Sequence, residues 1–234
     1  MELVFSVESI GGERRQPLSA SVQITRLYNF GYTGRNIEAV QEHIDELANL
    51  GLPAPKSVPA LFQLAPRLGT TEDTVVVSGN DSYGEVEYAL VRADDGEWYV
   101  TVASDHSDLA IEKISTSRSK SVYPDVLGST VWPLDEVLDD WDGLVLRNSR
   151  TDEFGTEIIQ ESPASAILPP QELISILKAR TGGEIPAGTI VLSGTVGGIP
   201  ESGAVRWEVS LRDSVRQRVI THAYRVEALP DELS

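Results

Sequence analysis

The segment between residues 74 and 105 constrains the fold more than any other part of the chain. It contains three runs rich in Val, Tyr and Thr, which read TVVVSG, GEVEYALVRA and WYVTVASD, and DDGE separates the last two. β-Branched and aromatic residues favour strands, and a short segment with Asp and Gly between two strands favours a hairpin turn. The segment therefore predicts an antiparallel hairpin inside a strand-rich domain.

Strands are also expected on both sides of this hairpin. Apolar and polar residues alternate in two runs near the C-terminus, which predicts two half-buried antiparallel strands, AVRWEVSLRD and RQRVITHAYRVEAL. Other strands are predicted at LVFSV, SASVQITRLYNF, GLVLRNS, EIIQES, SAIL and TIVLSGT.

Few helices are expected. Residues 37–49 carry apolar side chains at helical spacing, and Asn36 precedes them as a candidate cap. Helices are also predicted at residues 109–120 and at QELISILKAR, whereas the four prolines of LPAPKSVPALFQLAPRLG predict an extended segment without regular structure. With no repeat or composition break, the chain is interpreted as one strand-rich α+β domain over residues 1–234.

Charge and composition restrict the classes of function. A net charge of −17 argues against a nucleic-acid partner, because phosphate binding needs a basic surface. No run approaches the roughly 20 apolar residues that span a bilayer, and the N-terminus MELVFSVESIGGERR does not resemble a signal peptide. The absence of cysteine excludes disulfides and thiolate chemistry and fits a cytoplasmic protein.

Common catalytic motifs are missing as well. The sequence contains no G-x-S-x-G, G-x-x-x-x-G-K-[ST], G-x-G-x-x-G or H-E-x-x-H motif. It has three histidines, His43, His106 and His222, which are too few for a histidine-rich metal site. Any metal would therefore be held mainly by oxygen ligands.

Two acids one residue apart offer such ligands. Glu85 and Glu87 lie in the predicted strand GEVEYALV, so they share one face while Val86 points to the other. Asp105 ends the next strand and returns to them if the hairpin closes at DDGE. Carboxylates this close repel one another unless a cation lies between them, and three carboxylates suit Mg²⁺ or Mn²⁺. The alternative is that both glutamates lie on a solvated strand face.

Seven segments, in this order, resemble the motifs of the fumarylacetoacetate hydrolase family. They are GRN at 34–36, HIDE at 43–46, PALF at 59–62, EVE at 85–87, SDHS at 104–107, Lys120 within SRSKSVYP, and PAGTIVLSGTVGGI at 186–199. The resemblance covers most of the chain and is to a bacterial branch without an assigned function. It implies a mixed β-sandwich roll with a few peripheral helices and a homodimer.

The resemblance also implies roles for particular residues. Glu85, Glu87 and Asp105 would bind the divalent metal, which polarises a chelated 2-oxo or 1,3-dicarbonyl acid and stabilises its enolate. His43 and Glu46 would activate water, and Lys120 would stabilise developing negative charge. Substrate contacts would come from Arg35, Gly194 and Thr195.

The chain departs from the family pattern at several positions. In the family a histidine follows the asparagine of GRN by four residues, and Val40 takes that place here. His43 follows Asn36 by seven residues, which is close to one helical turn later. Other departures are Gln63, Leu109, Glu112, Thr189 and Val196. These changes predict a shifted substrate preference.

Three functions stay open at this point. The first is metal-dependent hydrolysis of a C–C bond in an acylpyruvate-like or β-dicarbonyl acid. The second is decarboxylation or keto–enol isomerisation of a 2-oxo acid at the same site. The third is a non-catalytic domain that binds a small molecule or has a structural role.

Overall fold

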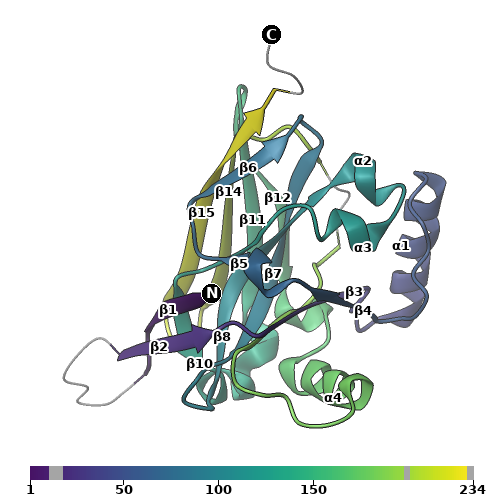
Figure 1. Cartoon of the computed structure of the whole chain (residues 1–234). Coiled ribbons are helices and arrows are strands. Elements are labelled where there is room, and N and C mark those ends of the chain that lie inside the picture. The colour runs from purple at the N-terminus through teal and green to yellow at the C-terminus, as the bar shows by residue number, and fades with distance from the viewer. Residues whose placement is uncertain (11–17, 198–200, 231–234) are drawn as a thin grey trace.

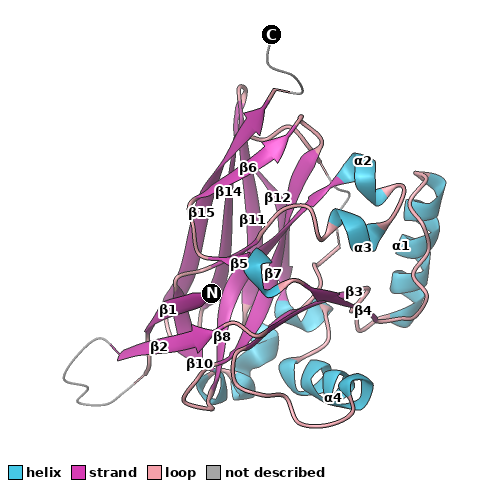
Figure 2. Ribbon diagram, viewed as in Figure 1, coloured by secondary structure: helices cyan, strands magenta, loops and turns pink. Residues whose placement is uncertain are grey.

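Two β-sheets form the body of the protein, and helices lie along one side (Figures 1 and 2). The computed structural model describes residues 1–10, 18–197 and 201–230. The larger sheet is mixed and has ten strands: β1 Glu2–Val7, β2 Leu18–Gln23, β3 Arg26–Gly31, β4 Ala60–Leu64, β5 Gly69–Thr70, β7 Ser82–Arg92, β8 Trp98–Asp108, β9 Asp125–Leu127, β10 Thr130–Pro133 and β13 Thr189–Leu192.

The smaller sheet has five strands in the order β12-β11-β14-β15-β6. Their bounds are β6 Thr74–Ser78, β11 Val145–Asp152, β12 Gly155–Pro163, β14 Arg206–Asp213 and β15 Arg218–Leu229. The α-helices are α1 Ile37–Asn49, α2 Leu109–Glu112, α3 Thr116–Ser119 and α4 Pro170–Thr181, and 3₁₀ turns cover Pro66–Leu68, Leu134–Glu136, Leu138–Gly143 and Ala164–Ala166. The expected strand-rich α+β fold is confirmed.

Strands β7 and β8 form the predicted hairpin at the centre of the larger sheet, in the strand order β2-β1-β10-β8-β7-β13-β3-β4. One face of β7 carries Val86, Tyr88 and Leu90, which pack in a core cluster with residues of the smaller sheet. Ala89 and Val91 face the other way, into a second cluster formed within the larger sheet. Because side chains alternate along a strand, Glu85 and Glu87 lie on this second face.

Helix α1 forms where the sequence predicts it. The side chain of Asn36 accepts hydrogen bonds from the backbone N–H groups of Glu38 and Ala39, at 3.0 and 3.2 Å, and so caps the first turn. The apolar stripe of the helix, Val40, Ile44 and Leu47, is buried against the body of the protein.

Three local predictions are wrong. Residues 109–120 form two short helices rather than one, because Ser115 adopts an extended conformation between them. The predicted strand SAIL contains a 3₁₀ turn at Ala164–Ala166. The proline-rich segment contains strand β4, which pairs only with β3 at the edge of the larger sheet, where a proline just before the strand is tolerated.

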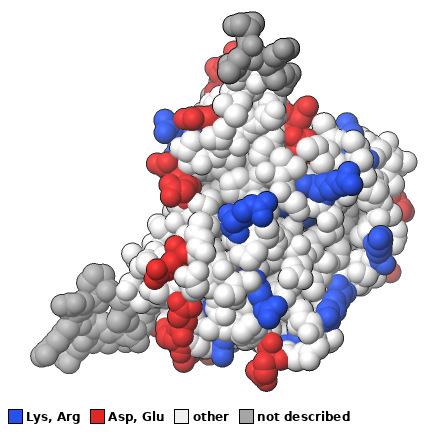
Figure 3. All heavy atoms as spheres, viewed as in Figure 1, with Lys and Arg blue, Asp and Glu red and all other residues white. Residues whose placement is uncertain are grey.

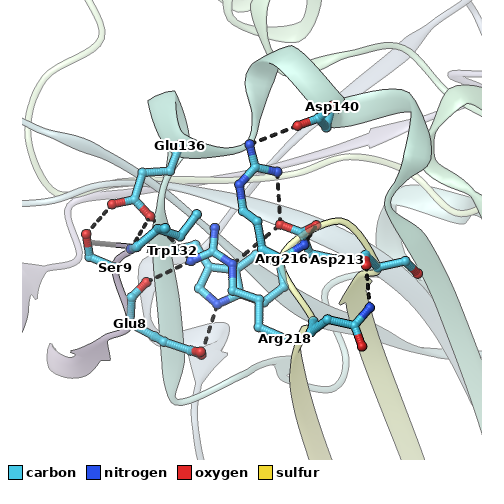
Figure 4. Close-up of polar contacts among 11 residues, drawn as sticks. Glu8, Ser9, Trp132, Glu136, Asp140, Asp213, Arg216 and Arg218 are labelled. Atoms are coloured by element: carbon cyan, nitrogen blue, oxygen red, sulfur yellow. Dashed lines mark hydrogen bonds and ion pairs between the residues drawn. The ribbon is translucent and has the colours of Figure 1, made fainter. Parts of the chain in front are cut away.

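A polar cluster links the residues that follow β1 to the β14–β15 hairpin (Figure 4). The guanidinium of Arg218 lies 4.3 Å from the ring centroid of Trp132 and donates to the carbonyl of Glu8 at 3.2 Å. Carboxylates of Glu136 and Asp213 lie 3.3 and 3.5 Å from the same guanidinium. These contacts pair a buried cation through its Nε and Nη1, while Nη2 has no hydrogen-bond partner among the described residues, and they hold segments distant in sequence together.

Candidate active site

A cavity of about 220 Å³ lies between α1, α3 and the larger sheet. Much of its wall is apolar, with Phe30, Val40, Leu47, Phe62 and Ile167 among the lining residues. Its polar lining includes Tyr32, His43, Glu85, Glu87, Glu112, Lys120 and Thr195. A largely apolar cavity with a few convergent polar groups is the usual form of a small-molecule site.

The three acids singled out in the sequence converge beside this cavity, and two of them, Glu85 and Glu87, line it. The β7–β8 register places Glu85 directly opposite Asp105, and one carboxylate oxygen from each of Glu85, Glu87 and Asp105 lies within 4.8 Å of the others. Glu87 and Asp105 are fully buried, whereas Glu85 is partly exposed to the cavity. The geometry therefore favours the converging arrangement over a solvated strand face.

One cation opposes the three acids. The ammonium of Lys120 is buried and pairs with Oδ2 of Asp105. Burial alone would lower the pKa of Lys120, but the charges of Asp105, Glu87 and Glu85 outweigh it and raise that pKa above its ordinary value. When ionised, these four groups leave two negative charges in a buried place.

Burial and crowding raise the pKa values of two of these carboxylates. Burial raises the pKa of Glu85 to about 8, and burial with the charge of Asp105 raises the pKa of Glu87 well above its usual range. Oε2 of Glu87 accepts the N–H of Gly194 at 2.7 Å, while its Oε1 is buried with no hydrogen-bond partner. An orphaned carboxylate oxygen, an all-oxygen donor set and two excess negative charges fit a divalent cation such as Mg²⁺ or Mn²⁺.

Side chains rather than a strand hold the edge of β7 beside these acids. Strand β13 pairs with β7 only from Ala89 to Arg92, so within the described part of the chain residues 82–88 have no strand neighbour on that edge. Gln160 accepts the N–H of Val86 at 3.2 Å, and Thr195 donates to the carbonyl of Val86 at 2.8 Å. Both backbone polar groups of Val86, the residue between the two glutamates, are thus hydrogen-bonded on this edge.

Asn148 and Gln160 extend this support from the smaller sheet. The amide nitrogen of Asn148 donates to the carbonyl of Gly84 and to Oε1 of Gln160, both at 2.9 Å, and Gln160 in turn donates to Thr195 Oγ1 at 3.0 Å. The sequence assigned no role to Asn148 or Gln160. The available signal was an amide on the inward face of each predicted strand, where alternation predicts an apolar residue.

Gly194 supports a carboxylate rather than the cavity wall. Its φ is +81°, and a Cβ there would lie 2.7 Å from Oγ1 of Thr33, so a side chain does not fit. Its N–H is committed to Glu87. Of the two predicted substrate-contact residues of this turn, Thr195 lines the cavity. The last two residues of the glycine-rich motif, 198 and 199, lie outside the described residues.

Helix α1 presents His43 to the cavity. Val40 and His43 lie about one turn apart and both line the cavity, so the histidine is on the same helix face as the usual position. Nδ1 of His43 lies 3.8 Å from Oε2 of Glu46, and the Glu46 side chain is 71% exposed. The structure thus places His43 at the cavity and Glu46 behind it, toward solvent.

Arg35 is held away from the cavity. Its guanidinium forms a two-pronged pair with Asp142, at 2.5 and 3.0 Å, and its Nε donates to the carbonyl of Ile167 at 2.8 Å. Arg35 is absent from the described lining, although Ile167 belongs to it. Arg35 therefore anchors a wall of the cavity, and the expected contact with a substrate carboxylate has no support in this geometry.

Two further residues line the cavity without a role assigned from the sequence. Glu112 is buried and accepts a hydrogen bond from the hydroxyl of Tyr83. Tyr32 has a φ of +58°, which is uncommon for a non-glycine residue and concentrates at functional sites. Burial and the charge of Glu112 raise the pKa of the Tyr32 phenol.

The other two histidines lie elsewhere. Nδ1 of His106 lies 3.0 Å from the hydroxyl of Tyr224, and burial lowers the pKa of His106 to about 4. His222 lies on β15, with Nε2 3.2 Å from the carbonyl of Glu72. Neither residue lines the cavity within the described part of the chain.

The charge distribution matters for an anionic ligand. Although the net charge is −17, lysines and arginines are spread over the face that carries the helices, and many of the acids visible in this view lie toward its left and lower edges (Figure 3). Two cations lie near α3 and are exposed: Lys113, which follows α2, and Arg118, which lies on α3. In the described ranges, no helix has the length and apolarity needed to cross a membrane.

Comparison with solved structures identifies the fold. The chain superposes on Cg1458 with a TM-score of 0.64 at 16% identity, covering 90% of this chain and 78% of that one. It superposes on 2-keto-3-deoxy-D-arabinonate dehydratase complexed with magnesium and 2,5-dioxopentanoate with a TM-score of 0.61 at 17% identity, covering 88% and 74%.

A third neighbour is 4-oxalocrotonate decarboxylase from Pseudomonas putida G7, complexed with calcium and acetate. Its TM-score is 0.54 at 17% identity, with coverage of 86% of this chain and 76% of that one. These neighbours are members of the fumarylacetoacetate hydrolase superfamily, so the fold implied by the sequence motifs is confirmed.

Sequence comparison places the chain in a family. A search of curated proteins finds no match. A family model described as a protein of unknown function, DUF2848, matches residues 30–224, and the chain therefore belongs to the DUF2848 family.

Proposed function

We propose that this protein is an enzyme that binds a small 2-oxo acid on a divalent cation and breaks a bond to the carbon beside the 2-oxo group. The observation that carries the proposal is the convergence of Glu85, Glu87 and Asp105 beside the cavity, which the two glutamates line, with Lys120 as the one opposing cation among the described lining residues. Such a site has two negative charges to offer a divalent ion and a cavity beside it for an organic acid.

Glu85, Glu87 and Asp105 would hold Mg²⁺ or Mn²⁺. The ion would supply Lewis acidity, polarising the 2-oxo group and stabilising the enolate that bond cleavage leaves behind. Two of the structural neighbours support this assignment, since one is complexed with magnesium and 2,5-dioxopentanoate and the other with calcium and acetate.

The chain's own groups divide the remaining tasks. Lys120 is buried beside Asp105 at the cavity, where its ammonium would offset negative charge that develops on the substrate. Thr195 would position the substrate from the glycine-rich turn. The apolar wall formed by Phe30, Val40 and Leu47 would limit access of water to the reacting atoms.

Hydrolysis of a C–C bond in an acylpyruvate-like acid is the reaction we favour. His43 lines the cavity and is within reach of Glu46, so this pair would take a proton from water as it attacks the carbonyl farther from the carboxylate. The C–C bond would then break, and its electron pair would remain on the 2-oxo fragment until a proton is added.

Decarboxylation of a 2-oxo acid, or its keto–enol isomerisation, is the second candidate. The exposed position of Glu46 favours it, because a carboxylate turned to solvent is a weak partner for a water-activating histidine. The decarboxylase among the structural neighbours supports it as well.

The first test measures whether metal and a 2-oxo acid mimic bind together. Mg²⁺ with oxalate is expected to raise the melting temperature by about 5–10 °C at concentrations near 100 times the dissociation constant. Mg²⁺ alone should give a smaller rise, and oxalate in the presence of a chelator should give none. A thermal melt that is unchanged by Mg²⁺ and oxalate together would contradict the proposed function.

The second test separates the two reactions. His43→Ala is expected to slow Mg²⁺-dependent hydrolysis of acetylpyruvate by about 10²- to 10⁴-fold, because water loses its base. Mg²⁺-dependent keto–enol tautomerisation of acetylpyruvate should change little, since it needs no water. Glu38→Ala, on the exposed first turn of the same helix, is the matched control. Equal loss of both activities would argue against His43 as a base for water alone.

A further inference from the structure

The cavity holds a fourth acid that the proposed metal site does not use. Glu112, the last residue of α2, is 9% exposed and lines the cavity together with Glu85 and Glu87. Its Oε2 accepts a hydrogen bond from the hydroxyl of Tyr83, which lies on β7 two residues before Glu85. Strand β7, which carries Glu85 and Glu87, therefore also holds the carboxylate of Glu112 in place.

Among the described residues, no cation forms an ion pair with Glu112. Lys120 is the one lysine or arginine in the described lining of the cavity, and its ammonium pairs with Asp105. Arg35 is occupied by Asp142 outside the cavity. The carboxylate thus faces the cavity without a counter-ion from the described residues.

The charges around the metal site explain what this carboxylate would recognise. A divalent cation with Lys120 would neutralise the three metal-site carboxylates, and the ion would attract the single carboxylate of a 2-oxo acid. Glu112 stands outside that balance. Burial raises the pKa of Glu112, whereas the hydrogen bond from Tyr83 and the charge of Lys120 favour its ionised form.

A second carboxylate on the substrate would meet Glu112 unfavourably. Two like charges about 4 Å apart repel by roughly 4 kcal/mol at the effective dielectric of a site near the surface. A hydroxyl or ammonium group would instead donate a hydrogen bond to the carboxylate, an interaction that discriminates strongly against analogues lacking the donor.

We propose that Glu112 forms a subsite that selects 2-oxo acids with one carboxylate and a hydrogen-bond donor in the remainder of the chain, and that it rejects dicarboxylates. The proposal rests on the proposed function, because the metal site fixes the opposite end of the substrate. Glu112 would be a specificity-determining residue rather than a catalytic one.

Calorimetric titration of the full chain in Mg²⁺ tests the subsite with five probes. Oxalate reports on the metal site alone, and 2-oxopentanoate gives the apolar reference. 4-Hydroxy-2-oxobutanoate and 4-amino-2-oxobutanoate carry the donor as a hydroxyl or an ammonium, and 2-oxoglutarate carries a second carboxylate. We expect a donor-bearing probe to bind about 10-fold more tightly than 2-oxopentanoate, and 2-oxoglutarate to bind at least about 10-fold more weakly.

Variants assign the selection to Glu112. Glu112→Gln should tighten 2-oxoglutarate by about 10-fold or more and weaken the ammonium probe, while oxalate affinity stays unchanged. Glu112→Asp keeps the charge and should still reject 2-oxoglutarate. If Glu112→Gln fails to fold, the wild-type ratio of 2-oxoglutarate to 2-oxopentanoate still decides the question.

The outcomes are distinguishable. Normal oxalate binding with 2-oxoglutarate equal to or tighter than 2-oxopentanoate in the wild-type protein would overturn the subsite and leave the proposed function standing. Unchanged probe ratios in a folded Glu112→Gln would do the same. Failure of oxalate to bind the wild-type protein in Mg²⁺ would overturn the proposed function and the subsite together.

Discussion

Glu87→Gln is expected to make the metal-free protein more stable and the metal-loaded protein inactive. In the absence of metal, Glu87 is a buried carboxylate with an unpartnered Oε1, and Asp105 and Glu85 repel its charge. The isosteric amide removes that charge, and its oxygen can still accept the N–H of Gly194. We expect a gain of about 1–3 kcal/mol in the free energy of unfolding without metal.

The same change should remove the catalytic metal. A divalent ion loses one of three charged ligands, so the stabilisation by Mg²⁺ should largely disappear and turnover should fall by about 10³-fold or more. Melting curves with and without Mg²⁺ give the first result, and steady-state rates give the second. Opposite signs for stability and activity distinguish a removed ligand from a damaged core.

Asp125→Asn is the matched control for this experiment. Asp125 is also buried, and burial followed by the charge of Asp105 raises its pKa well above the usual range. It lies outside the group of three converging acids. Asp125→Asn should therefore stabilise the metal-free protein but leave the response to Mg²⁺ intact. If Glu87→Gln and Asp125→Asn respond equally to Mg²⁺, Glu87 is no ligand.

The crowding of acids also fixes the sign of the pH dependence. Burial raises the pKa of Glu85 from 4.5 to about 8, so between these values the folded metal-free protein keeps a proton that the unfolded chain has lost. Stability without metal should therefore fall as pH rises through this window, and Mg²⁺ affinity should rise over the same window, because Glu85 must lose its proton to act as a ligand.

Local signals explain which parts of the fold were predictable. Asn36 caps α1, and strand-forming residues flank the turn of the β7–β8 hairpin, so neighbours in sequence suffice for both. The 3₁₀ turn after Pro163 is flanked by hydrogen bonds to distant segments, from the N–H of Ala164 to the carbonyl of Leu144 and from the N–H of Leu168 to the carbonyl of Thr33. Periodicity carries no information about such contacts.

The candidate site divides in the same way. Glu85, Glu87 and Asp105 could be placed because a strand alternates with period two and a hairpin fixes its own register. Arg35 could not, since its partner Asp142 is 107 residues away. Gln160 was missed because its link to Val86 spans 74 residues and two sheets. Sequence reasoning found the acids, and only the structure revealed what holds their strand.

Lys120→Met is expected to have the opposite effect on stability from Glu87→Gln while also reducing activity. Lys120 is the cation paired with buried Asp105, and its removal leaves three carboxylates together with no positive charge. Breaking one partner of a buried ion pair typically costs about 3–5 kcal/mol. Without metal, the melting temperature should therefore fall.

Mg²⁺ should rescue that stability but not the activity. The ion neutralises the three carboxylates, so its stabilising effect on Lys120→Met should exceed its effect on the wild-type protein. Turnover should stay lower by about 10²- to 10³-fold even at saturating Mg²⁺, because no ammonium faces the charge that develops on the substrate. Calorimetric melts and rates measured over a Mg²⁺ series separate the two effects.

Lys113→Met is the matched control, since Lys113 is exposed and close to Lys120 in sequence. Its melting temperature and turnover should match the wild-type protein. In the wild-type protein the charge of Glu87 acts on Lys120, so the two positions are coupled. In the double variant Glu87→Gln/Lys120→Met, part of the stability lost with the lysine should return, because the two remaining carboxylates repel each other less than three do. Strict additivity of the two changes would show that Lys120 does not sense Glu87, and a Lys120→Met enzyme with wild-type turnover would remove this lysine from the proposed chemistry.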